Sequence, residues 1–497
     1  MENNEEILMT EEEYGEQVRI RRDKLKTLSE NGANPYEQTR FDVDTLSTEI
    51  LADFTAYENK TVKVAGRILS RRIMGKASFA HLLDSKGKIQ IYVKRDNVGE
   101  EVYADWKKAD IGDIYGIEGT VFMTHSGEVS VSVTKMVMLS KSLLPLPEKF
   151  HGLKDNDLRY RQRYVDLIVN PEVKENFVVR SRIIKAIRDT LDSKGFVEVE
   201  TPVLNTIAGG ASARPFITHH NTLDLNMYMR IAPELYLKRL IVGGFDKVYE
   251  IGKMFRNEGM DVKHNPEFTM MELYWAYADY HDMMDITEEI YHAALTAAGK
   301  GDKITYEGVE IDLTSPWERL TMLDAIKKYV GIDYDKMTAE EALEAAKSVG
   351  VEIDDKKTAW GNIVYATFDQ KVEEKLIQPV FITDYPIEES PLTKQKTEDP
   401  RLTYRFEFFI FAREMGNAYS ELNDPIDQKK RFEAQMALRE KGDDEAQMMD
   451  DDFVTALEYG MPPTGGLGIG IDRLIMLLTD SSSIRDVMLF PTMKPKK

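Results

Sequence analysis

The sequence of 497 residues contains no cysteine, and this absence excludes disulfides, thiolate metal sites and cysteine nucleophiles. No apolar run approaches the roughly 18 residues that a membrane-spanning helix needs, so we expect no membrane contact. The opening segment, MENNEEILMTEEEYGEQ, is acidic and lacks an apolar signal core, so we expect a cytoplasmic protein. Neither a GxxxxGK(S/T) phosphate loop nor a strand followed by GxGxxG occurs, which disfavours the two common enzyme types that bind ATP or NAD through them.

Acidic residues outnumber basic ones by 86 to 65, which gives a net charge of −21. This balance argues against a histone-like binder of nucleic acid, although it leaves room for a local basic surface. The hydrophobic fraction of 42% and charged fraction of 30% are typical of a soluble globular protein. The length predicts about three domains.

A local basic region lies within residues 59–144, which hold 14 Lys and Arg against 9 Asp and Glu. About five short stretches alternate apolar and polar residues and are separated by glycine-containing turns, a pattern typical of strands. A small OB-fold barrel fits this pattern, and such barrels bind single-stranded nucleic acid with aromatic and basic side chains. Phe79 and Gln90 are candidate base readers. The spacing fits equally well an alternative in which Phe79 belongs to the core and the arginines are only a solvated edge.

The segments around this barrel have simpler patterns. Residues 1–58 form an expected helical extension with one helix over 11–31, whose basic side chains fit a solvated helix at least as well as a nucleic-acid contact. Residues 145–154 contain Pro145 and Pro147, so we expect a linker there.

Residues 155–497 are expected to form one α+β domain with a mainly antiparallel sheet flanked by helices, because short turns join several strands. Within it, 299–365 is interpreted as a mostly helical insertion of unknown purpose. The expected helices are 175–194 and 472–479, and the expected strands lie near 227–231, 247–254, 267–275, 404–411 and 419–422.

The segment KMFRNEGMDVKHNPEFTMMELYWAY predicts a strand, a loop and a returning strand. Phe268, Met270, Glu272 and Tyr274 recur at every second position and therefore share one face. A buried glutamate needs a cationic partner, which argues against a plain core. Arg256 precedes the loop and could bind a phosphate in a bidentate manner. A surface hairpin with incidental charges is the alternative.

A second segment, YRFEFFIFAREMGNAYSELND, carries Glu407 in an aromatic strand and Glu414 seven positions later. A bend near residues 413–416 is needed to bring the two carboxylates together. With nucleotide phosphates they would suit Mg²⁺, which prefers oxygen ligands, but pairing with Arg405 or Arg413 fits equally well.

The third segment is MPPTGGLGIGIDRLIMLLTDSSSIRDVMLFP, a glycine-rich strand followed by an apolar helix. Its glycines allow a ligand or another backbone to approach closely. Arg473 lies at the start of the helix, where the guanidinium and the helix dipole could attract a phosphate together.

Together the chain resembles the class II aminoacyl-tRNA synthetases. GFVEVETPVL, FRNEG…HNPEFTMMELY and GLGIGIDRLIML are similar to motifs 1, 2 and 3 in that order. GGASARPF, RIAPELYLKRL and GNAYSELNDP resemble the bacterial-type lysyl-tRNA synthetase family. The resemblance implies a homodimer whose catalytic domain follows an OB-fold anticodon-binding domain. It also implies activation of L-lysine with ATP to lysyl-adenylate and pyrophosphate, followed by transfer of lysine to the 3′ end of tRNA(Lys).

The same resemblance assigns roles to single residues. Arg256 would bind the ATP α-phosphate, Arg473 the γ-phosphate, and Glu258 would contact ATP and help to place the tRNA end. The other residues implied for ATP are His264, Asn265, Phe268 (stacked on adenine), and Glu407 and Glu414, which would coordinate Mg²⁺. The implied catalytic group is Arg256, Glu258, Asn417 and Arg473.

The resemblance also implies an amino-acid pocket and an anticodon site. The pocket residues are Gly210, Glu234, Arg256, Glu272, Tyr274, Asn417, Tyr419 and Glu421. Carboxylates suit a buried lysine ammonium, whereas an aspartate-specific relative would need a cation deep in the pocket. Phe79 and Gln90 would read anticodon bases.

Three alternatives stay open at this point. An aspartyl- or asparaginyl-tRNA synthetase would share the fold. A lysine ligase acting on a protein would lack the barrel. A non-catalytic RNA-binding scaffold would not need the intact Arg256, Glu407, Glu414 and Arg473.

Overall fold

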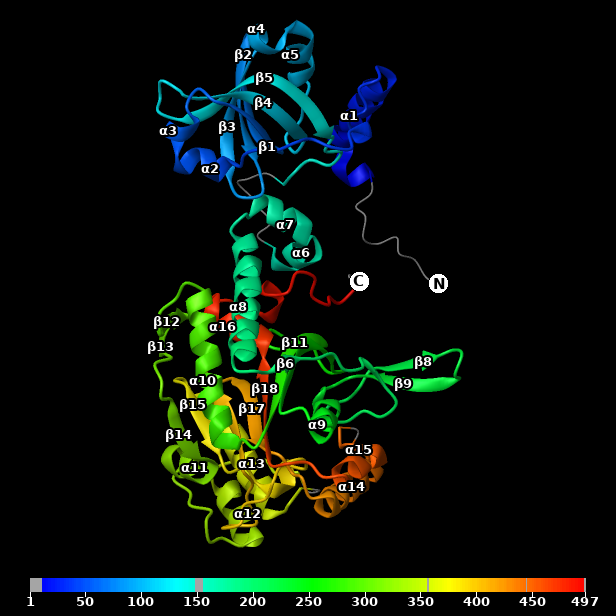
Figure 1. The fold of residues 1–497 in the computed structure, drawn as a ribbon, viewed down its shortest axis with the longest axis vertical. Coiled ribbons are helices and arrows are strands. Elements are labelled where there is room, and N and C mark those ends of the chain that lie inside the picture. The colour runs from blue at the N-terminus through cyan, green and yellow to red at the C-terminus, as the bar shows by residue number, and fades with distance from the viewer. Residues whose placement is uncertain (1–10, 148–154, 355–356, 444, 496–497) are drawn as a thin grey trace. The chain divides into compact units, whose positions relative to one another are not determined.

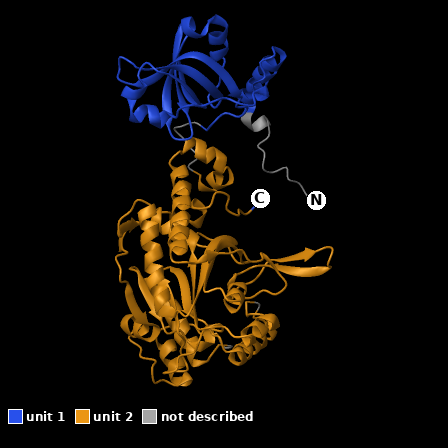
Figure 2. Ribbon diagram, viewed as in Figure 1, with its two compact units in different colours: residues 1–154, 495–497 blue, residues 155–494 orange. Residues whose placement is uncertain are grey.

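The computed structural model describes residues 11–147, 155–354, 357–443 and 445–495. The chain divides into unit 1 (residues 1–154 and 495–497) and unit 2 (155–494), which Figure 2 colours separately. The opening ten residues and most of the expected linker, 148–154, lie outside the described residues. Among the helices of the described part, none is both long and apolar enough to cross a bilayer.

Unit 1 is built on a closed barrel with strand order β1-β2-β3-β5-β4 (Figure 1), which confirms the expected OB-type barrel. Its strands are β1 (Thr61–Met74), β2 (Ala77–Leu83), β3 (Lys88–Lys94), β4 (Ile114–Met123) and β5 (Val129–Ser140). Its helices are α1 (Glu11–Glu30), α2 (Ser47–Ala52), α3 (Phe54–Tyr57), α4 (Arg95–Val98) and α5 (Glu100–Trp106). In β2 and β3, fully buried residues alternate with half-buried ones, so one face fills the barrel and the other faces outward.

Helix α1 is joined to the barrel by charged contacts. Arg21 Nη1 donates hydrogen bonds to the carbonyls of Ile111, Ser142 and Leu144 at 3.0–3.1 Å. Lys24 Nζ pairs with Asp110 Oδ1 at 2.7 Å. These two cations of the expected basic helix are therefore engaged within unit 1.

Unit 2 contains an eight-stranded sheet with order β14-β15-β16-β17-β18-β11-β10-β6. The pairs β14–β15 and β10–β6 are parallel, and the other neighbours are antiparallel, which confirms the mainly antiparallel sheet. Its strands are β6 (Val197–Glu198), β10 (Lys247–Phe255), β11 (Glu267–Ala276), β14 (Glu318–Thr321), β15 (Val380–Thr383), β16 (Arg405–Phe409), β17 (Glu414–Ser420) and β18 (Thr464–Gly470).

Two small sheets complete the strands of unit 2. One is the hairpin of β12 (Lys303–Tyr306) and β13 (Val309–Asp312), and the other has the order β7-β9-β8, formed by β7 (Leu204–Asn205), β8 (Ile217–His220) and β9 (Leu225–Met229). Strands β8 and β9 extend outward from the rest of unit 2 in Figure 1.

The helices of unit 2 flank its sheets. They are α6 (Asn156–Arg161), α7 (Arg163–Val169), α8 (Val173–Ser193), α9 (Glu234–Val242), α10 (Tyr280–Ala297), α11 (Met322–Val330), α12 (Ala339–Ser348), α13 (Trp360–Lys371), α14 (Pro425–Glu440), α15 (Asp451–Glu458) and α16 (Ile471–Leu478).

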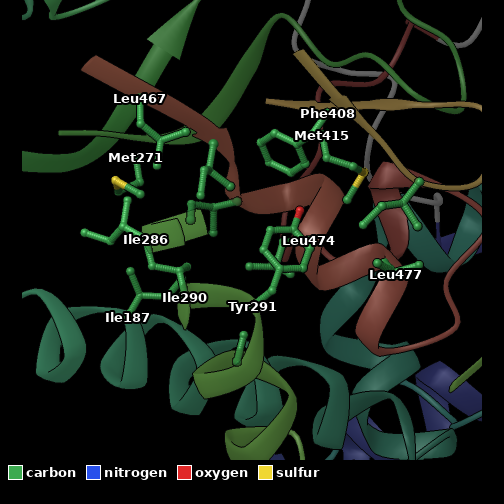
Figure 3. Packing of buried hydrophobic residues seen from close by; sticks show 14 of the residues in the cluster. Ile187, Met271, Ile286, Ile290, Tyr291, Phe408, Met415, Leu467, Leu474 and Leu477 are labelled. Carbon is green, nitrogen blue, oxygen red and sulfur yellow. The ribbon is translucent and has the colours of Figure 1, made fainter. Parts of the chain in front are cut away.

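The main core lies on one face of the large sheet, as Figure 3 shows. Side chains of α8, α10 and α16, such as Ile187, Ile290 and Leu474, pack there against Met271 and Leu467. Because alternate strand residues point to opposite faces, this core uses the odd-numbered residues of β11 and β18, which are Met271, Leu273, Leu467 and Ile469. The residues between them face away from these helices, and this second face carries the candidate site.

Two sequence expectations differ from the structure. The strand expected at 419–422 is β17, which starts at Glu414, because residues Phe411 and Ala412 adopt positive φ of 55° and 52° and turn the chain tightly. The expected helical segment 299–365 also contains β12, β13 and β14. Its residues 303–312 alternate with period two around Glu307–Gly308, where positive φ at both residues suits a tight hairpin turn.

Candidate active site

The glycine-rich strand β18 lies between β11 and β17 and keeps the second face of the sheet open. Gly468 is opposite Glu272 on one side and Asn417 on the other, and Gly466 is opposite Tyr274 and Tyr419 in the same way. A methyl group on Gly466 would lie 2.0 Å from Glu421 Oε1. Glycine is therefore required there so that polar groups of both neighbouring strands can meet over β18.

A first cavity, named here the amino-acid pocket, lies over this glycine strand. It brings together seven of the eight residues expected around the amino acid, namely Gly210, Glu234, Arg256, Glu272, Tyr274, Asn417 and Tyr419. Gly210 has a φ of 88°, and a Cβ there would come within 3.2 Å of Glu234 Cβ, so both conformation and space favour glycine. The eighth residue, Glu421, does not line the pocket.

Glu234 is the first residue of α9 and is held from two sides. The Tyr419 hydroxyl donates to Glu234 Oε1 at 2.7 Å. Lys238, one helical turn later, donates to the same oxygen at 2.5 Å. The carboxylate is therefore fixed at the pocket wall by a phenol and an ammonium.

Glu421 is 1% exposed and lies next to the pocket wall at Gly466. Its Oε2 forms an ion pair with Lys238 Nζ, but neither carboxylate oxygen has a hydrogen-bond partner of good geometry among the described residues. Burial raises the pKa of Glu421, and the Lys238 ammonium is the largest influence that holds the rise back. A buried carboxylate with unused acceptor capacity is suited to a further cationic donor.

Glu272 lines the amino-acid pocket from β11. It accepts a hydrogen bond from the Tyr274 hydroxyl at 3.0 Å. Burial is the main cause, and the charge of Glu234 the second, that raises the pKa of Glu272 to about 8. Near neutral pH this carboxyl is therefore largely protonated.

A second cavity, named here the nucleotide pocket, adjoins the first. It contains seven of the eight residues expected around ATP, namely Arg256, Glu258, His264, Asn265, Phe268, Glu414 and Arg473. The eighth, Glu407, lines the amino-acid pocket instead. Arg256, Met270, Glu414 and Asn417 line both cavities, so the two pockets meet at these residues.

Arg473 follows the start of α16 and is anchored by contacts on both sides. Its Nη1 donates to the carbonyl oxygen of Glu414, lies 3.3 Å from Glu414 Oε2, and its Nη2 lies 3.3 Å from His264 Nε2. The preceding residue, Asp472, accepts from Arg180 Nη1 and from the backbone amide of Thr269, both at 2.6 Å. The helix start is thereby tied to β11, and Arg473 is directed into the nucleotide pocket.

Arg256 lies at the junction of the two cavities. Its guanidinium carbon is 5.1 Å from the centre of the Phe268 ring, and its buried Nε has no hydrogen-bond partner among the described residues. Burial lowers the pKa of Arg256, against the opposing charges of Glu258 and Glu414. An anionic ligand would supply the missing acceptor.

Glu407 and Glu414 come from the two strands of the β16–β17 hairpin and both line the amino-acid pocket. Glu407 accepts from Arg405 Nη2 at 2.6 Å and from the Tyr385 hydroxyl at 2.9 Å, so the expected alternative of arginine pairing also occurs. Burial raises the pKa of Glu407 to about 7. Among the described residues no cluster of three or more acidic or histidine side chains could hold a metal by itself. Two carboxylates therefore fit Mg²⁺ only in combination with phosphate oxygens and water.

In the barrel, Phe79 lies on the outer face and is absent from the buried core cluster. Its ring is 4.8 Å from Tyr92, and Tyr92 is 5.9 Å from Phe122. Gln90 shares this face, where its Oε1 accepts from Ser130 Oγ and its Nε2 donates to Glu128, both at 2.7 Å. The outward aromatic row provides surfaces on which bases can stack.

Several residues at these sites were missed in the sequence. Lys238 follows Glu234 by four positions, a spacing that places both on one helix face, and this was the available signal. Tyr92 has the same strand parity as Gln90 and could have been found in the same way. The contact of Tyr385 with Glu407 has no sequence signal, because it joins two separate segments of the chain.

The comparisons with known proteins agree with this geometry. The family described as "tRNA synthetases class II (D, K and N)" matches residues 155–494, and an "OB-fold nucleic acid binding domain" matches residues 62–139. A lysine–tRNA ligase of Thermoanaerobacter pseudethanolicus is 59% identical over 495 residues, covering 99% of both chains. That of Moorella thermoacetica is 60% identical over 479 residues, covering 96% of this chain and 98% of its own. This chain belongs to the lysine–tRNA ligase family of class II tRNA synthetases.

Proposed function

We propose that unit 2 activates L-lysine with ATP and transfers the lysyl group to tRNA(Lys) bound partly by unit 1. The observation that carries this proposal is the shared wall of the two cavities. Arg256, Glu414 and Asn417 line both the carboxylate-rich pocket and the arginine-lined pocket. A lysine carboxylate and an ATP α-phosphate bound in these pockets would meet at that wall.

The chemistry follows from this placement. The lysine carboxylate attacks the α-phosphorus in line, and pyrophosphate leaves. Orientation by the two pockets lowers the barrier because both reactants are held near each other. Arg256 stabilises the charge on the transferring phosphoryl group, Arg473 binds the γ-phosphate, and Phe268 stacks on adenine. In the second step a terminal ribose hydroxyl of the tRNA attacks the lysyl-adenylate.

Specificity for lysine is attributed to the buried carboxylates. Glu234 and Glu421 would take the ε-ammonium, since a buried cation needs opposite charge close by. An aspartate or asparagine side chain would bring no cation to these carboxylates in addition to Lys238, which already pairs with both. Glu258, His264 and Asn265 line the nucleotide pocket and are assigned to ATP, and Gly210, Glu272, Tyr274, Asn417 and Tyr419 to the amino acid.

Mg²⁺ would be held by Glu407 and Glu414 together with the phosphates. When bound, this ion neutralises phosphate charge and stabilises the leaving pyrophosphate. Arg405 and Tyr385 fix the Glu407 carboxyl in place, and Arg473 lies 3.3 Å from Glu414. The protein therefore contributes an oriented pair of oxygen donors.

We assign the remaining parts of the chain by the same reasoning. Residues 59–144 would form the anticodon-binding domain, with Phe79 stacking on a base and Gln90 bonding to one. Residues 1–58 would form an extension, 145–154 a linker, and 155–497 the catalytic domain. As a member of this family, the protein is assigned to the cytoplasm, where tRNA is charged.

A homodimer is proposed from the exposed edge of unit 2. Strand β6 ends the large sheet, and an edge strand offers unpaired backbone groups to another chain. Exposed apolar side chains continue from this edge to the small outer sheet, and they are Val197, Val203, Leu204, Ile217 and Leu225. A two-fold interface is the commonest assembly for such a surface.

The test is ATP–pyrophosphate exchange by the purified protein with lysine, aspartate or asparagine, followed by charging of tRNA(Lys). We expect exchange with lysine alone and a requirement for Mg²⁺. Exchange with aspartate or asparagine, or none with any of the three, would overturn the proposal. Sedimentation equilibrium tests the homodimer separately.

A further inference from the structure

The protein places an ammonium group of its own, that of Lys238, next to the amino-acid pocket. Lys238 is 0% exposed and its Nζ contacts the same two carboxylates, Glu234 and Glu421, that the proposed function assigns to the substrate ammonium. Lys238 itself does not line the pocket. A lysine is rarely buried unless it is paired, so its presence here requires an explanation.

The surroundings of Lys238 keep it charged. Its Nζ lies 2.5 Å from Glu234 Oε1, and the rings of Tyr419 and Phe453 have their centres 5.5 and 5.8 Å away. Burial disfavours the ammonium form, but Glu234 and Glu421 outweigh this and raise the pKa of Lys238. The group is therefore a fixed positive charge in a dry environment.

The charges of this cluster have a simple balance. With Glu234 and Glu421 both ionised, a state that their contacts with the Lys238 ammonium favour, two carboxylates and one ammonium leave one uncompensated negative charge, which one substrate ammonium would neutralise. Glu272 adds little to this balance near neutral pH, because its carboxyl is largely protonated, and Arg256 lowers its pKa more than Lys238 does. Without Lys238 the two buried carboxylates would repel each other, with no cation of the protein between them.

We propose that Lys238 is a positioning residue that sets the net charge of the Glu234–Glu421–Lys238 cluster to minus one, so that the cluster accepts a single ammonium group, the ε-ammonium of lysine. This inference rests on the proposed function and adds a specificity role to it. Lys238 draws Glu234 and Glu421 together from behind the wall. Both oxygens of Glu421 keep unused acceptor capacity beside Gly466, so Glu421 can accept a donor from the substrate.

A purely structural role for Lys238 makes a different prediction. In that case the ion pair only joins α9 to the chain after β17. A substitution of Lys238 would then weaken lysine binding further when it is combined with a second substitution nearby. A charge-setting role predicts the opposite. Removing the cation should compensate for removing one of the two carboxylates.

The experiment compares Glu421→Gln, Lys238→Met and the double variant, with lysine KM and kcat measured by ATP–pyrophosphate exchange. Glu421→Gln leaves Glu234 fully neutralised by Lys238, so lysine KM should rise by about a hundredfold. The double variant restores one net negative charge on Glu234, so its KM should be at least about tenfold lower than that of Glu421→Gln. The kcat values should differ much less, because the reacting carboxylate is at the other end of the substrate.

A second measurement keeps the test independent of catalysis. The ratio of the lysine Kd to the Kd of norleucine, which lacks the ε-ammonium, should rise in Glu421→Gln and return toward the wild-type ratio in the double variant. If Glu421→Gln does not fold, Glu234→Gln with and without Lys238→Met gives the same comparison. Arg239→Met is the matched control, because this neighbouring cation of α9 pairs with Asp450 instead, and its lysine KM should change less than about twofold.

The outcomes separate the two proposals. A double variant that binds lysine no better than Glu421→Gln, in an enzyme whose wild type is active with lysine, overturns the role of Lys238 alone. An unchanged KM in Glu421→Gln overturns it as well. Wild-type protein without any lysine-dependent exchange overturns the proposed function itself.

Discussion

Tyr419 donates a hydrogen bond to Glu234 over 2.7 Å, although 185 positions separate the two residues in the chain. The phenol comes from β17 and the carboxylate from the first turn of α9. Desolvation and the nearby carboxylates raise the pKa of Tyr419 well above its usual value, so the hydroxyl stays a donor. This contact joins the sheet to the helix that supplies the acidic side of the pocket.

Replacing Tyr419 by Phe should therefore weaken lysine binding. The variant removes one donor from a charged acceptor, so we expect the lysine KM to rise about tenfold with little change in kcat. Steady-state exchange kinetics measure both. Tyr404→Phe is a control, because its hydroxyl bonds to the exposed Glu398. An unchanged KM in Tyr419→Phe would show that Glu234 is positioned by Lys238 alone.

Arg256→Ala should abolish most adenylate formation while the fold remains. Among the described residues that line the nucleotide pocket, only Arg256 has a buried side-chain nitrogen without a hydrogen-bond partner. We expect exchange activity to fall by about 10²–10³, with an unchanged melting temperature. Lys253→Ala, an exposed cation of β10 paired with Glu267, is the control. Normal exchange by Arg256→Ala would refute the role of Arg256.

Gly466→Ala should damage the amino-acid pocket. The added methyl group would lie 2.0 Å from Glu421 Oε1 and 2.7 Å from the Tyr274 ring, so the carboxylate must move. We expect a rise of about tenfold or more in lysine KM. Gly301→Ala is the matched control, because a Cβ there meets nothing within 4 Å. Equal lysine KM values in the two variants would contradict the assigned position of Glu421.

Glu272 should make stability depend on pH. Its pKa of about 8 lies above the usual 4.5 because burial disfavours the charge. The folded protein thus binds this proton more tightly, and the resulting stability is full below about pH 4.5 and lost as the pH rises through about 8.

Glu272→Gln cannot ionise and should lack this loss. The free energy of unfolding of the variant, relative to the wild type, should increase by roughly 3 kcal/mol between pH 5 and pH 8, as measured by urea titration without ligands. Glu267→Gln, exposed on the same strand, should show no such trend. A constant difference between Glu272→Gln and the wild type would mean that Glu272 is already ionised at pH 5.

Phe79→Ala should separate tRNA binding from amino-acid activation. Loss of one stacking surface should raise the KM for tRNA(Lys) by roughly tenfold. Exchange without tRNA should keep its wild-type rate, because Phe79 lies in unit 1 and the two pockets lie in unit 2. Equal charging kinetics of variant and wild type would exclude Phe79 from the anticodon site.

Much of this protein could be predicted from short-range patterns. Period-two alternation in 267–276 placed Glu272 and Tyr274 on one face, and the structure has them on the pocket side of β11. The bend between Glu407 and Glu414 was also predicted from their parity, but near residues 413–416, whereas the chain turns at 411–412. Two positive φ angles at Phe411 and Ala412 depend on the packed hairpin, and neither residue type favours them.

The amino-acid order by itself determined the barrel, strands β10, β11 and β16, the glycine-rich strand and the identity of the acidic and basic groups, because these depend on neighbours within a few positions. Only the tertiary structure decided which groups meet. Lys238 neutralises Glu421 from a helix 183 residues earlier, and Glu407 is fixed by Tyr385 of another segment. Such pairings depend on how distant elements pack, and charges become strongly coupled only where that packing removes water.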